Sequence, residues 1–222
     1  MTSPSVVVFD VNETLSDMAP MARRFADIGV PEVMAKVWFA SLLRDGFALA
    51  AAGATEQFSV IGAGALRSVL SGAALRMDMD SAVQHVMEGF SSLEVHPDVP
   101  DGVRALAAAG ARLVTLTNGS VHVAERLFSA AGISQHFERL LSVDDAGVWK
   151  PAAGAYAYAA RTCATDATDM ILVAVHPWDI DGAARAGMRT CWINRSDVPY
   201  PEYFRAPEIT LTALPELADH LW

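Results

Sequence analysis

The chain has 222 residues and a formal net charge of −10, from 16 Lys and Arg against 26 Asp and Glu. Hydrophobic residues make up 52% and charged residues 19% of it, which excludes a disordered or low-complexity protein. The length suits one domain, or one domain with an insert. The acidic balance argues against a broad surface for nucleic acid or anionic membrane, but it allows one small anionic substrate in a local basic pocket.

The two cysteines, Cys163 and Cys191, are isolated and have no metal-ligand spacing. Neither a disulfide framework nor a zinc site is therefore expected, and a reducing cytoplasm is the simplest location. The first apolar run stops at once at Asp10, which does not fit a signal peptide. No stretch approaches the about 18 consecutive apolar residues of a membrane-spanning helix.

Short β-branched runs recur along the chain, and each is nearly continuously apolar, as is typical of strands buried on both faces. These runs are residues 5–10, 111–118, 139–145, 170–176 and 189–194. Helix-compatible stretches lie between the later runs, at 100–109, 120–131, 152–162 and 180–186. This alternation predicts an α/β fold with a doubly wound parallel sheet.

Residues 16–94 break the alternation, because they are rich in Ala, Leu and Met at helical spacing and contain no convincing strand. They predict a helical insert after the first strand. Residues 1–15 and 95–222 would then form the core domain. Trp38 and Leu42 fit the interior of the insert, and an insert at this point could overhang the strand ends as a cap.

Polar clusters follow the predicted strands, and in a parallel sheet ligands bind where the carboxyl ends of the strands meet. Asp10 closes the first strand, with Asn12 and Thr14 behind it. A carboxylate there can be a nucleophile, or it can merely cap a turn. Thr117 and Asn118 leave the second strand before a helix, where they could hold an anion or simply form a turn.

Three further clusters complete the pattern. Asp144 and Asp145 end the third apolar run, and Lys150 stands before a proline, hence in an extended or turn conformation. His176 and Asp179 follow the fourth run. Taken singly, Lys150 could be a surface lysine and Asp179 a helix cap. The order and spacing of the clusters at strand ends nevertheless favour one common site.

These blocks, in this order and with a helical insert after the first, resemble the haloacid dehalogenase superfamily, whose nucleophilic aspartate stands where Asp10 does. Within it, residues 140–151, 155–161 and 187–197 are most similar to the L-2-haloacid dehalogenases. The resemblance covers essentially the whole chain. It implies a Rossmann-like core with a cap domain, an enzyme and a homodimer.

The superfamily is dominated by magnesium phosphatases, which have a second Asp two residues after the nucleophile. Here that position is Asn12, and the Gly-Asp pair of their fourth motif is missing, so that only Asp179 remains. Losing general acid–base help costs about 10²–10⁴-fold in rate. We therefore expect no metal and no cofactor, with Lys150 supplying the positive charge. A magnesium phosphatase acting on a small phosphoester is the alternative.

The resemblance implies two-step covalent hydrolysis of a short 2-haloalkanoic acid. Asp10 would attack C2 and expel halide, and water would then cleave the aspartyl ester to a 2-hydroxy acid of inverted configuration. Lys150 would keep the nucleophile ionised and stabilise the oxyanion. The catalytic residues would be Asp10, Thr14, Thr117, Lys150 and Asp179.

The resemblance also implies the substrate-binding residues, which are Asn12, Trp38, Phe39, Asn118, Tyr156, His176 and Trp178. His176 stands where the subgroup has Asn, and with Asp179 it would orient or deprotonate the water, or else be structural. Tyr156 would hydrogen-bond Asp10 or Lys150, or else face the core.

The predicted cap also departs from the subgroup, whose members carry an Arg directly after a Trp on the first long cap helix to hold the departing halide. Here Phe39 follows Trp38. Arg44 lies nearly two turns further on and cannot simply replace that arginine. Arg23 and Arg24 are other candidates, unless all three are surface groups. A low-activity relative or a binding protein is therefore a second alternative, against which the retained charged residues argue.

Overall fold

The structure is a computed structural model that describes residues 6–221. It divides into two compact units. One contains the chain as far as Ser16 and again from Glu94 onward, and the other is Asp17–Leu93. The chain therefore leaves the first unit after one strand and returns to it before the next.

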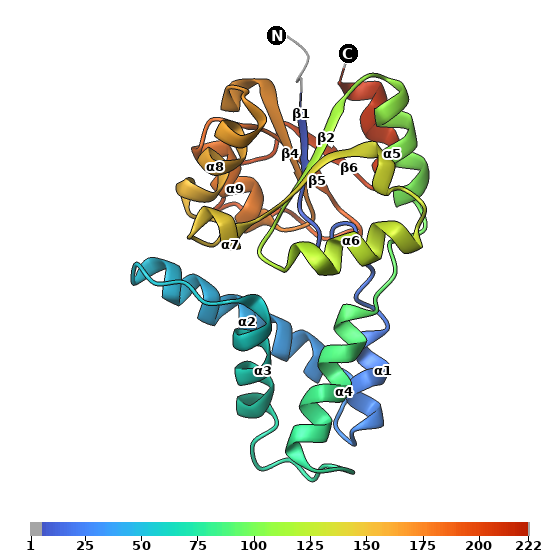
Figure 1. Ribbon diagram of the computed structural model, residues 1–222, viewed down its shortest axis with the longest axis vertical. Helices are drawn as coiled ribbons and strands as arrows, with labels where there is room; N and C mark the ends of the chain where they lie inside the picture. The colour runs from blue at the N-terminus through green and yellow to red at the C-terminus, as the bar shows by residue number, and fades with distance from the viewer. Residues whose placement is uncertain (1–5, 222) are drawn as a thin grey trace. The chain divides into compact units, whose positions relative to one another are not determined.

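A six-stranded parallel sheet forms the centre of the first unit, in the order β3-β2-β1-β4-β5-β6 (Figure 1). The strands are β1 (Val6–Phe9), β2 (Arg112–Thr117), β3 (Phe137–Ser142), β4 (Met170–Ala174), β5 (Arg189–Ile193) and β6 (Ile209–Leu211). The predicted doubly wound parallel sheet and its five expected strands are confirmed. Because β1 lies between β2 and β4, its carboxyl end is flanked by the carboxyl ends of both neighbours.

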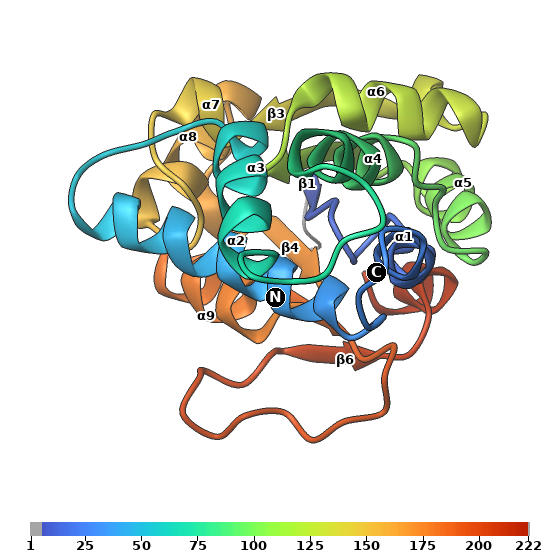
Figure 2. The ribbon, with the colours of Figure 1, turned by 90° about the horizontal axis from the view of Figure 1, so that it is seen from below.

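The sixth strand was not predicted. β6 has only three residues, too few for a recognisable apolar run, and it lies at the edge of the sheet. A long connection, residues 194–208, separates it from β5 and projects beside it in Figure 2.

The third strand ends earlier than predicted. β3 stops at Ser142, and Asp144 and Asp145 lie exposed on the short helix α7 (Val143–Ala146). The Ser142 hydroxyl donates to the carbonyl of Gly119 at 2.8 Å and is buried. Ser142, rather than the two aspartates, is therefore the buried polar residue at this strand end.

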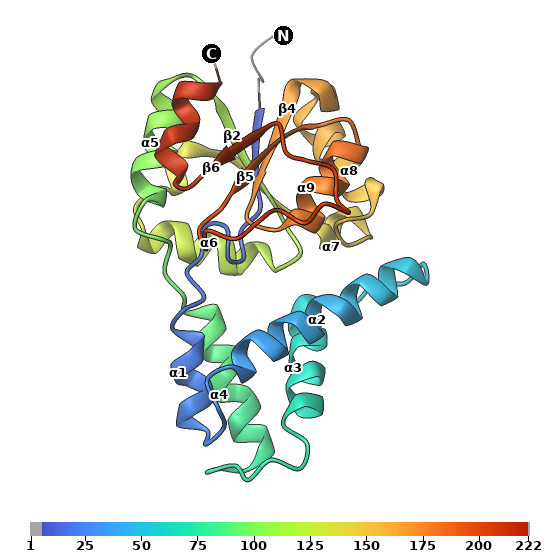
Figure 3. The same ribbon diagram turned by 180° about the vertical axis from the view of Figure 1, so that it is seen from behind.

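Helices cover both faces of the sheet (Figures 1 and 3). One face carries α5 (Val99–Ala108), α6 (Val121–Ala130) and η3 (Leu214–His220), and the other carries α8 (Ala153–Cys163) and α9 (Pro177–Arg185). Two single 3-10 turns are η1 (Ser134–His136) and η2 (Ala167–Asp169). The four predicted helices are confirmed, although α9 begins at Pro177 rather than Ile180. All four β1 residues are completely buried, as their unbroken apolar run predicted.

The second unit is helical throughout, with α1 (Met21–Asp27), α2 (Met34–Ala51), α3 (Phe58–Val69) and α4 (Met79–Ser91). Trp38 on α2 is fully buried and packs edge-on against Phe90, with ring centroids 5.8 Å apart. Its indole N–H donates to the Gly62 carbonyl on α3 at 2.9 Å. Across residues 6–221, the structure contains no helix with the length and apolar character that a membrane span requires.

Candidate active site

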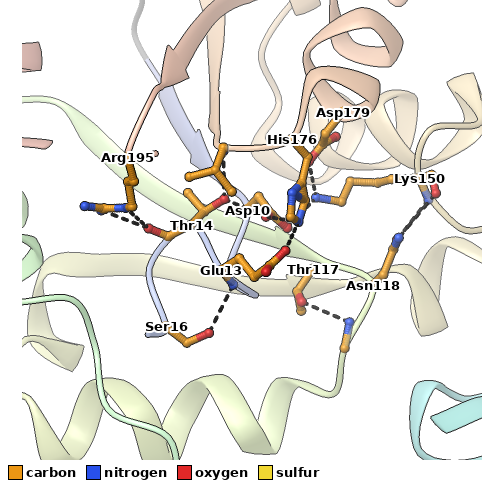
Figure 4. Close-up of polar contacts among 12 residues, drawn as sticks. Asp10, Glu13, Thr14, Ser16, Thr117, Asn118, Lys150, His176, Asp179 and Arg195 are labelled. Carbon is orange, nitrogen blue, oxygen red and sulfur yellow. Dashed lines mark hydrogen bonds and ion pairs between the residues drawn. The ribbon is translucent and has the colours of Figure 1, made fainter. Parts of the chain in front are cut away.

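Asp10 lies at the carboxyl end of β1, at the middle of the sheet edge. Its backbone N–H donates to the Val173 carbonyl at 3.0 Å and so continues the β1–β4 pairing by one residue. The hydroxyl of Thr14 donates to Asp10 Oδ2 at 2.7 Å and accepts from the N–H of Val175 at 3.0 Å (Figure 4). Asp10 is 3% exposed, so its carboxylate depends on protein groups rather than on water.

Lys150 brings a cation into contact with this carboxylate. Its Nζ donates to Asp10 Oδ1 at 2.9 Å and to Asp179 Oδ2 at 2.5 Å, and its side chain is completely buried. The main chain of Lys150 is held by the amide of Asn118: Oδ1 accepts from the Lys150 N–H at 3.0 Å, and Nδ2 donates to its carbonyl at 3.3 Å. Asn118 thereby ties the connection before α8 to the end of β2.

Asp179 lies in the first turn of α9 and is completely buried. Its Oδ1 accepts from the Tyr156 hydroxyl at 2.6 Å, and its Oδ2 accepts from Lys150. This contact requires a glycine nearby, because a Cβ at Gly182 would lie 2.5 Å from the Tyr156 hydroxyl and 2.7 Å from Pro151 Cβ. The absence of a side chain at Gly182 lets α9 approach α8.

The ammonium and the two carboxylates shift each other's ionisation. Burial raises the pKa of Asp10, but the charge of Lys150, with help from His176 and Thr14, outweighs it and holds that pKa below its usual value. Burial lowers the pKa of Lys150, but the charges of the Asp10 and Asp179 carboxylates outweigh burial and raise that pKa above its usual value. At neutral pH the nucleophile is therefore an anion beside a cation.

The pKa of Asp179 moves the other way. Burial raises it to about 6, with the charge of Lys150 opposing and that of Asp10 adding to the shift. Burial and the neighbouring Asp179 raise the pKa of Tyr156 well above its usual 10, so this phenol stays a hydrogen-bond donor.

His176 precedes α9, and its ring stacks on that of Trp178 with centroids 5.0 Å apart. Its Nε2 lies 3.8 Å from Asp10 Oδ2 and 3.6 Å from Glu13 Oε2. Burial lowers the pKa of His176 to about 4 against the opposing charge of Asp10, so the ring is neutral at pH 7. The Trp178 ring centre lies 5.9 Å from Lys150 Nζ, within reach of a cation–π interaction.

Glu13 was not predicted as a site residue. It has a φ of 61°, uncommon for a residue other than glycine. Its N–H donates to Ser16 Oγ at 3.3 Å, and its carbonyl lies 3.0 Å from His96 Nε2. Composition and periodicity give no signal for this conformation. Only its place in the turn between Asp10 and Thr14 could have drawn attention to it.

Arg195 was also missed. Its guanidinium donates to the Thr14 carbonyl from Nη2 at 3.0 Å and to Asp98 Oδ1 from Nη1 at 2.8 Å. Asp98 Oδ2 in turn accepts from the N–H of Leu214 at 2.8 Å. Arg195, just after β5, therefore holds the turn that carries Thr14. The dipeptide Asn-Arg at the end of a strand is too common a pattern to have revealed this.

Asn12 and Thr117, two further predicted residues, lie side by side at the ends of β1 and β2. Thr117 Oγ1 accepts from the Gly119 N–H at 2.9 Å. A Cβ at Gly119 would lie 3.3 Å both from Asn12 Nδ2 and from Thr117 Oγ1. The predicted residues of the sheet unit are thus gathered around the ends of β1, β2 and β4.

The remaining predicted residues, Trp38 and Phe39, belong to the helical unit, where both are buried and their ring centroids lie 6.3 Å apart. Two of the arginines considered as substitutes are surface groups of that unit. Arg23 pairs with Asp27 at 3.0 Å, with 81% of its side chain exposed, and Arg44 pairs with its neighbour Asp45 at 2.8 Å, with 68% exposed.

Comparison with known proteins agrees with this arrangement. A family model described as haloacid dehalogenase-like hydrolase matches residues 4–187. The chain belongs to this family. The predicted superfamily is thereby confirmed.

The chain is 30% identical to the haloacetate dehalogenase H-2 of Moraxella sp. (strain B) and 33% identical to an (S)-2-haloacid dehalogenase of Pseudomonas sp. (strain YL), each over 141 residues. These alignments cover 63% of the chain, which spans 63% and 61% of those two relatives. A crystal structure of an L-2-haloacid dehalogenase matches with a TM-score of 0.92 and 28% identity, covering 99% of both chains.

In this haloacid dehalogenase-like hydrolase, a side chain of the protein is the cation between the two carboxylates. A magnesium ion needs oxygen ligands at about 2.0–2.1 Å in near-octahedral geometry. The ammonium of Lys150 lies instead between Asp10 and Asp179 and is bonded to both. From Val6 to Leu221, the structure places no three His, Cys, Asp or Glu side chains so that they could hold a metal. This donor set does not fit magnesium.

Proposed function

We propose that this protein is a hydrolase that cleaves the carbon–halogen bond of short 2-haloalkanoic acids through an aspartyl ester and releases 2-hydroxy acids. The observation that carries the proposal is the buried ammonium of Lys150 between Asp10 and Asp179. It keeps the nucleophile ionised and supplies positive charge from within the chain. The likeness to haloacid dehalogenases supports the substrate class.

In the first half-reaction, a carboxylate oxygen of Asp10 attacks C2 from the face opposite the halogen. The new C–O bond forms as the carbon–halogen bond breaks, and the halide leaves with its electron pair. The hydrogen bonds from Thr14 and Lys150 fix the carboxylate, so that less orientational freedom is lost at the moment of attack.

In the second half-reaction, water attacks the carboxyl carbon of the Asp10 ester, and the bond from that carbon to the alcohol oxygen breaks. Negative charge develops on the remaining carboxyl oxygen. Lys150 Nζ, 2.9 Å from Asp10 Oδ1, is placed to stabilise it. The complete reaction consumes one water and releases one halide, one proton and one 2-hydroxy acid.

Other residues support these steps. Asn118 positions Lys150 through its main chain, and Tyr156 holds Asp179, which anchors the ammonium. Thr117 completes the catalytic set, and Asn12 lies beside it to meet the substrate. The Trp178 ring, stacked on His176, offers an apolar surface to the substrate chain.

We assign residues 16–94 the role of a cap domain on a catalytic core of residues 1–15 and 95–222. Trp38 and Phe39 would be the cap residues that serve the substrate, with Phe39 in place of the usual arginine. A phenyl ring does not neutralise a departing halide. We therefore expect slow turnover of standard haloacids and a preference for bulkier, more apolar ones.

We further place the protein in the cytoplasm as a homodimer, with no nucleic-acid or membrane partner. Cys163 and Cys191 are both buried free thiols, which suits a reducing compartment. Sedimentation at the mass of one 23.7 kDa chain would contradict the dimer.

The test incubates the protein with racemic 2-chloro- and 2-bromopropionate and measures halide release with and without EDTA. Asp10→Asn is the test variant, and Asp101→Asn, whose side chain is 81% exposed, is the matched control. We expect release that survives EDTA, persists in Asp101→Asn and disappears in Asp10→Asn.

Two outcomes would overturn the proposal. No halide release from the haloacids, together with magnesium-dependent phosphate release from a small phosphoester, would make the protein a phosphatase. Stoichiometric binding of haloacids without turnover would make it a binding protein that kept the fold.

A further inference from the structure

Asp179 is poorly placed to activate the water of the second half-reaction. Its Oδ1 is bonded to Tyr156 at 2.6 Å and its Oδ2 to Lys150 at 2.5 Å. No part of the residue is exposed. Taking a proton from water would require Asp179 to give up one of these strong hydrogen bonds. Its geometry is that of a residue that positions Lys150.

His176 also lies beside the nucleophile, and its ring carries a nitrogen that can accept a proton. Its Nε2 faces Asp10 Oδ2 at 3.8 Å, and 10% of its side chain is exposed, so water can reach it. Stacking on Trp178 fixes the plane of the ring. Figure 4 shows the imidazole edge directed toward both Asp10 and the Glu13 carboxylate.

We propose that His176 is the general base for hydrolysis of the ester intermediate and that Glu13 is its positioning residue. This inference rests on the proposed haloacid hydrolysis. Nε2 takes a proton from water as the water oxygen bonds to the Asp10 carboxyl carbon. The bond to the alcohol oxygen then breaks, and the imidazolium returns its proton to that oxygen, giving the 2-hydroxy acid. The new Asp10 carboxylic acid loses its proton to solvent.

The charges around His176 differ between the resting enzyme and the ester intermediate. In the resting enzyme Nε2 faces the carboxylates of Asp10 and Glu13, with Lys150 and Asp179 beyond Asp10. Alkylation turns Asp10 into a neutral ester and removes one of the two carboxylates that favour a proton on Nε2. The Glu13 carboxylate, 3.6 Å away, remains to stabilise the imidazolium that forms. Because the Glu13 side chain is 40% exposed, solvent screens its effect, which should be modest.

Burial also sets the protonation state of His176. Burial lowers its pKa to about 4, so the ring is unprotonated at neutral pH and carries a lone pair that can accept a proton. The amide of an asparagine could not accept a proton in this way.

The experiment separates the two half-reactions by rapid quenching with 2-bromopropionate. In His176→Phe, which keeps an aromatic ring against Trp178, and in His176→Asn, we expect one halide per active site to be released in a burst. Turnover should then be slowed about 10²-fold or more, the usual loss when a general base is removed. Mass spectrometry of the Asp10 peptide should show the ester accumulating.

Controls keep the interpretation specific. His136→Phe changes a histidine at the amino end of the sheet, before β3, and should behave like the parent. Circular dichroism checks that each variant folds, and the two substitutions at His176 differ in size and shape. Glu13→Gln should slow only the hydrolysis step, by several-fold, and Glu13→Asp should restore most of it.

The outcomes separate a failure of the role of His176 from a failure of the proposed haloacid hydrolysis. Steady turnover within about 3-fold of the parent in both folded His176 variants would overturn the role of His176 and leave haloacid hydrolysis standing. Loss of the burst itself would also overturn it, because His176 would then act in alkylation or binding. If the parent enzyme releases no halide and forms no ester, the proposed function fails first.

Discussion

The two units of this chain differ in where they place charge. The sheet unit buries Asp10, Lys150 and Asp179 almost completely and bonds them to one another. The helical unit packs rings around Trp38, and its Arg–Asp pairs, such as Arg67 with Asp80, are largely exposed. Desolvating charges commonly costs more than their pairing returns. The buried charges of the sheet unit therefore indicate chemistry rather than stability.

The largest expected effect comes from removing the buried cation. Lys150→Met leaves two carboxylates buried without their ammonium, so we expect turnover to fall by at least about 10²–10³-fold and the free energy of unfolding by about 3–5 kcal/mol at pH 7. Without the ammonium, burial should raise the pKa of both Asp10 and Asp179 in the folded variant. The folded state would then bind more protons than the unfolded state. The stability of the variant should therefore rise as pH falls from about 8 toward 5.

Urea unfolding at several pH values measures this change. Arg67→Met removes one partner of an exposed pair and serves as the control, with no measurable change expected. Equal stability of Lys150→Met and the parent at pH 7 would contradict the view that Lys150 compensates the buried carboxylates.

The next effect belongs to the helical unit. Trp38→Ala removes a completely buried ring and leaves the Gly62 carbonyl without its donor, so we expect a loss of about 3–5 kcal/mol confined to this unit. Hydrogen exchange should increase in α2 and α3 and stay unchanged in β1. Trp38→Phe, which keeps an aromatic ring, should cost less. Equal loosening of β1 would show that the two units do not unfold separately.

A smaller effect is expected at the contact between Tyr156 and Asp179. Tyr156→Phe deletes the donor 2.6 Å from Asp179 Oδ1 and should cost about 1.5–3 kcal/mol, typical of a hydrogen bond to a charged group. Tyr203→Phe is the control, because Tyr203 is 80% exposed. Denaturant midpoints compare the two. Identical midpoints would mean that water replaces the lost phenol.

The smallest effect tests the close approach of α9. Gly182→Ala puts a Cβ 2.5 Å from the Tyr156 hydroxyl, which should cost about 1–3 kcal/mol and lower turnover by displacing Tyr156. Gly64→Ala, inside α3 with open space around it, should instead add about 0.5–1 kcal/mol. Thermal unfolding with halide-release assays would decide. Full activity in Gly182→Ala would separate the packing of α9 from the site.

The strands were predictable from periodicity, and the charged centre was predictable from its polar residues at strand ends together with the resemblance to haloacid dehalogenases. Unbroken apolar runs such as 6–9 read as buried strands, and their carboxyl ends must meet at one sheet edge, which brought Asp10 and Asp179 together. The partners of Asn118 were not predictable, because its amide bonds to a main chain 32 residues away. Nor was the turn at Glu13, whose φ of 61° depends on tertiary contacts rather than on residue type.

The pairing of β1 has a consequence for the order in which the protein assembles. β1 is synthesised well before one of its two neighbours, β4, which ends only at Ala174. At about 5–20 residues per second, the ribosome delivers that neighbour on the order of ten seconds after β1. The local contacts of α1–α4 can form during that interval. Asp10 can meet Lys150 and Asp179 only afterwards, so the charged centre forms only once the chain has been synthesised as far as Asp179.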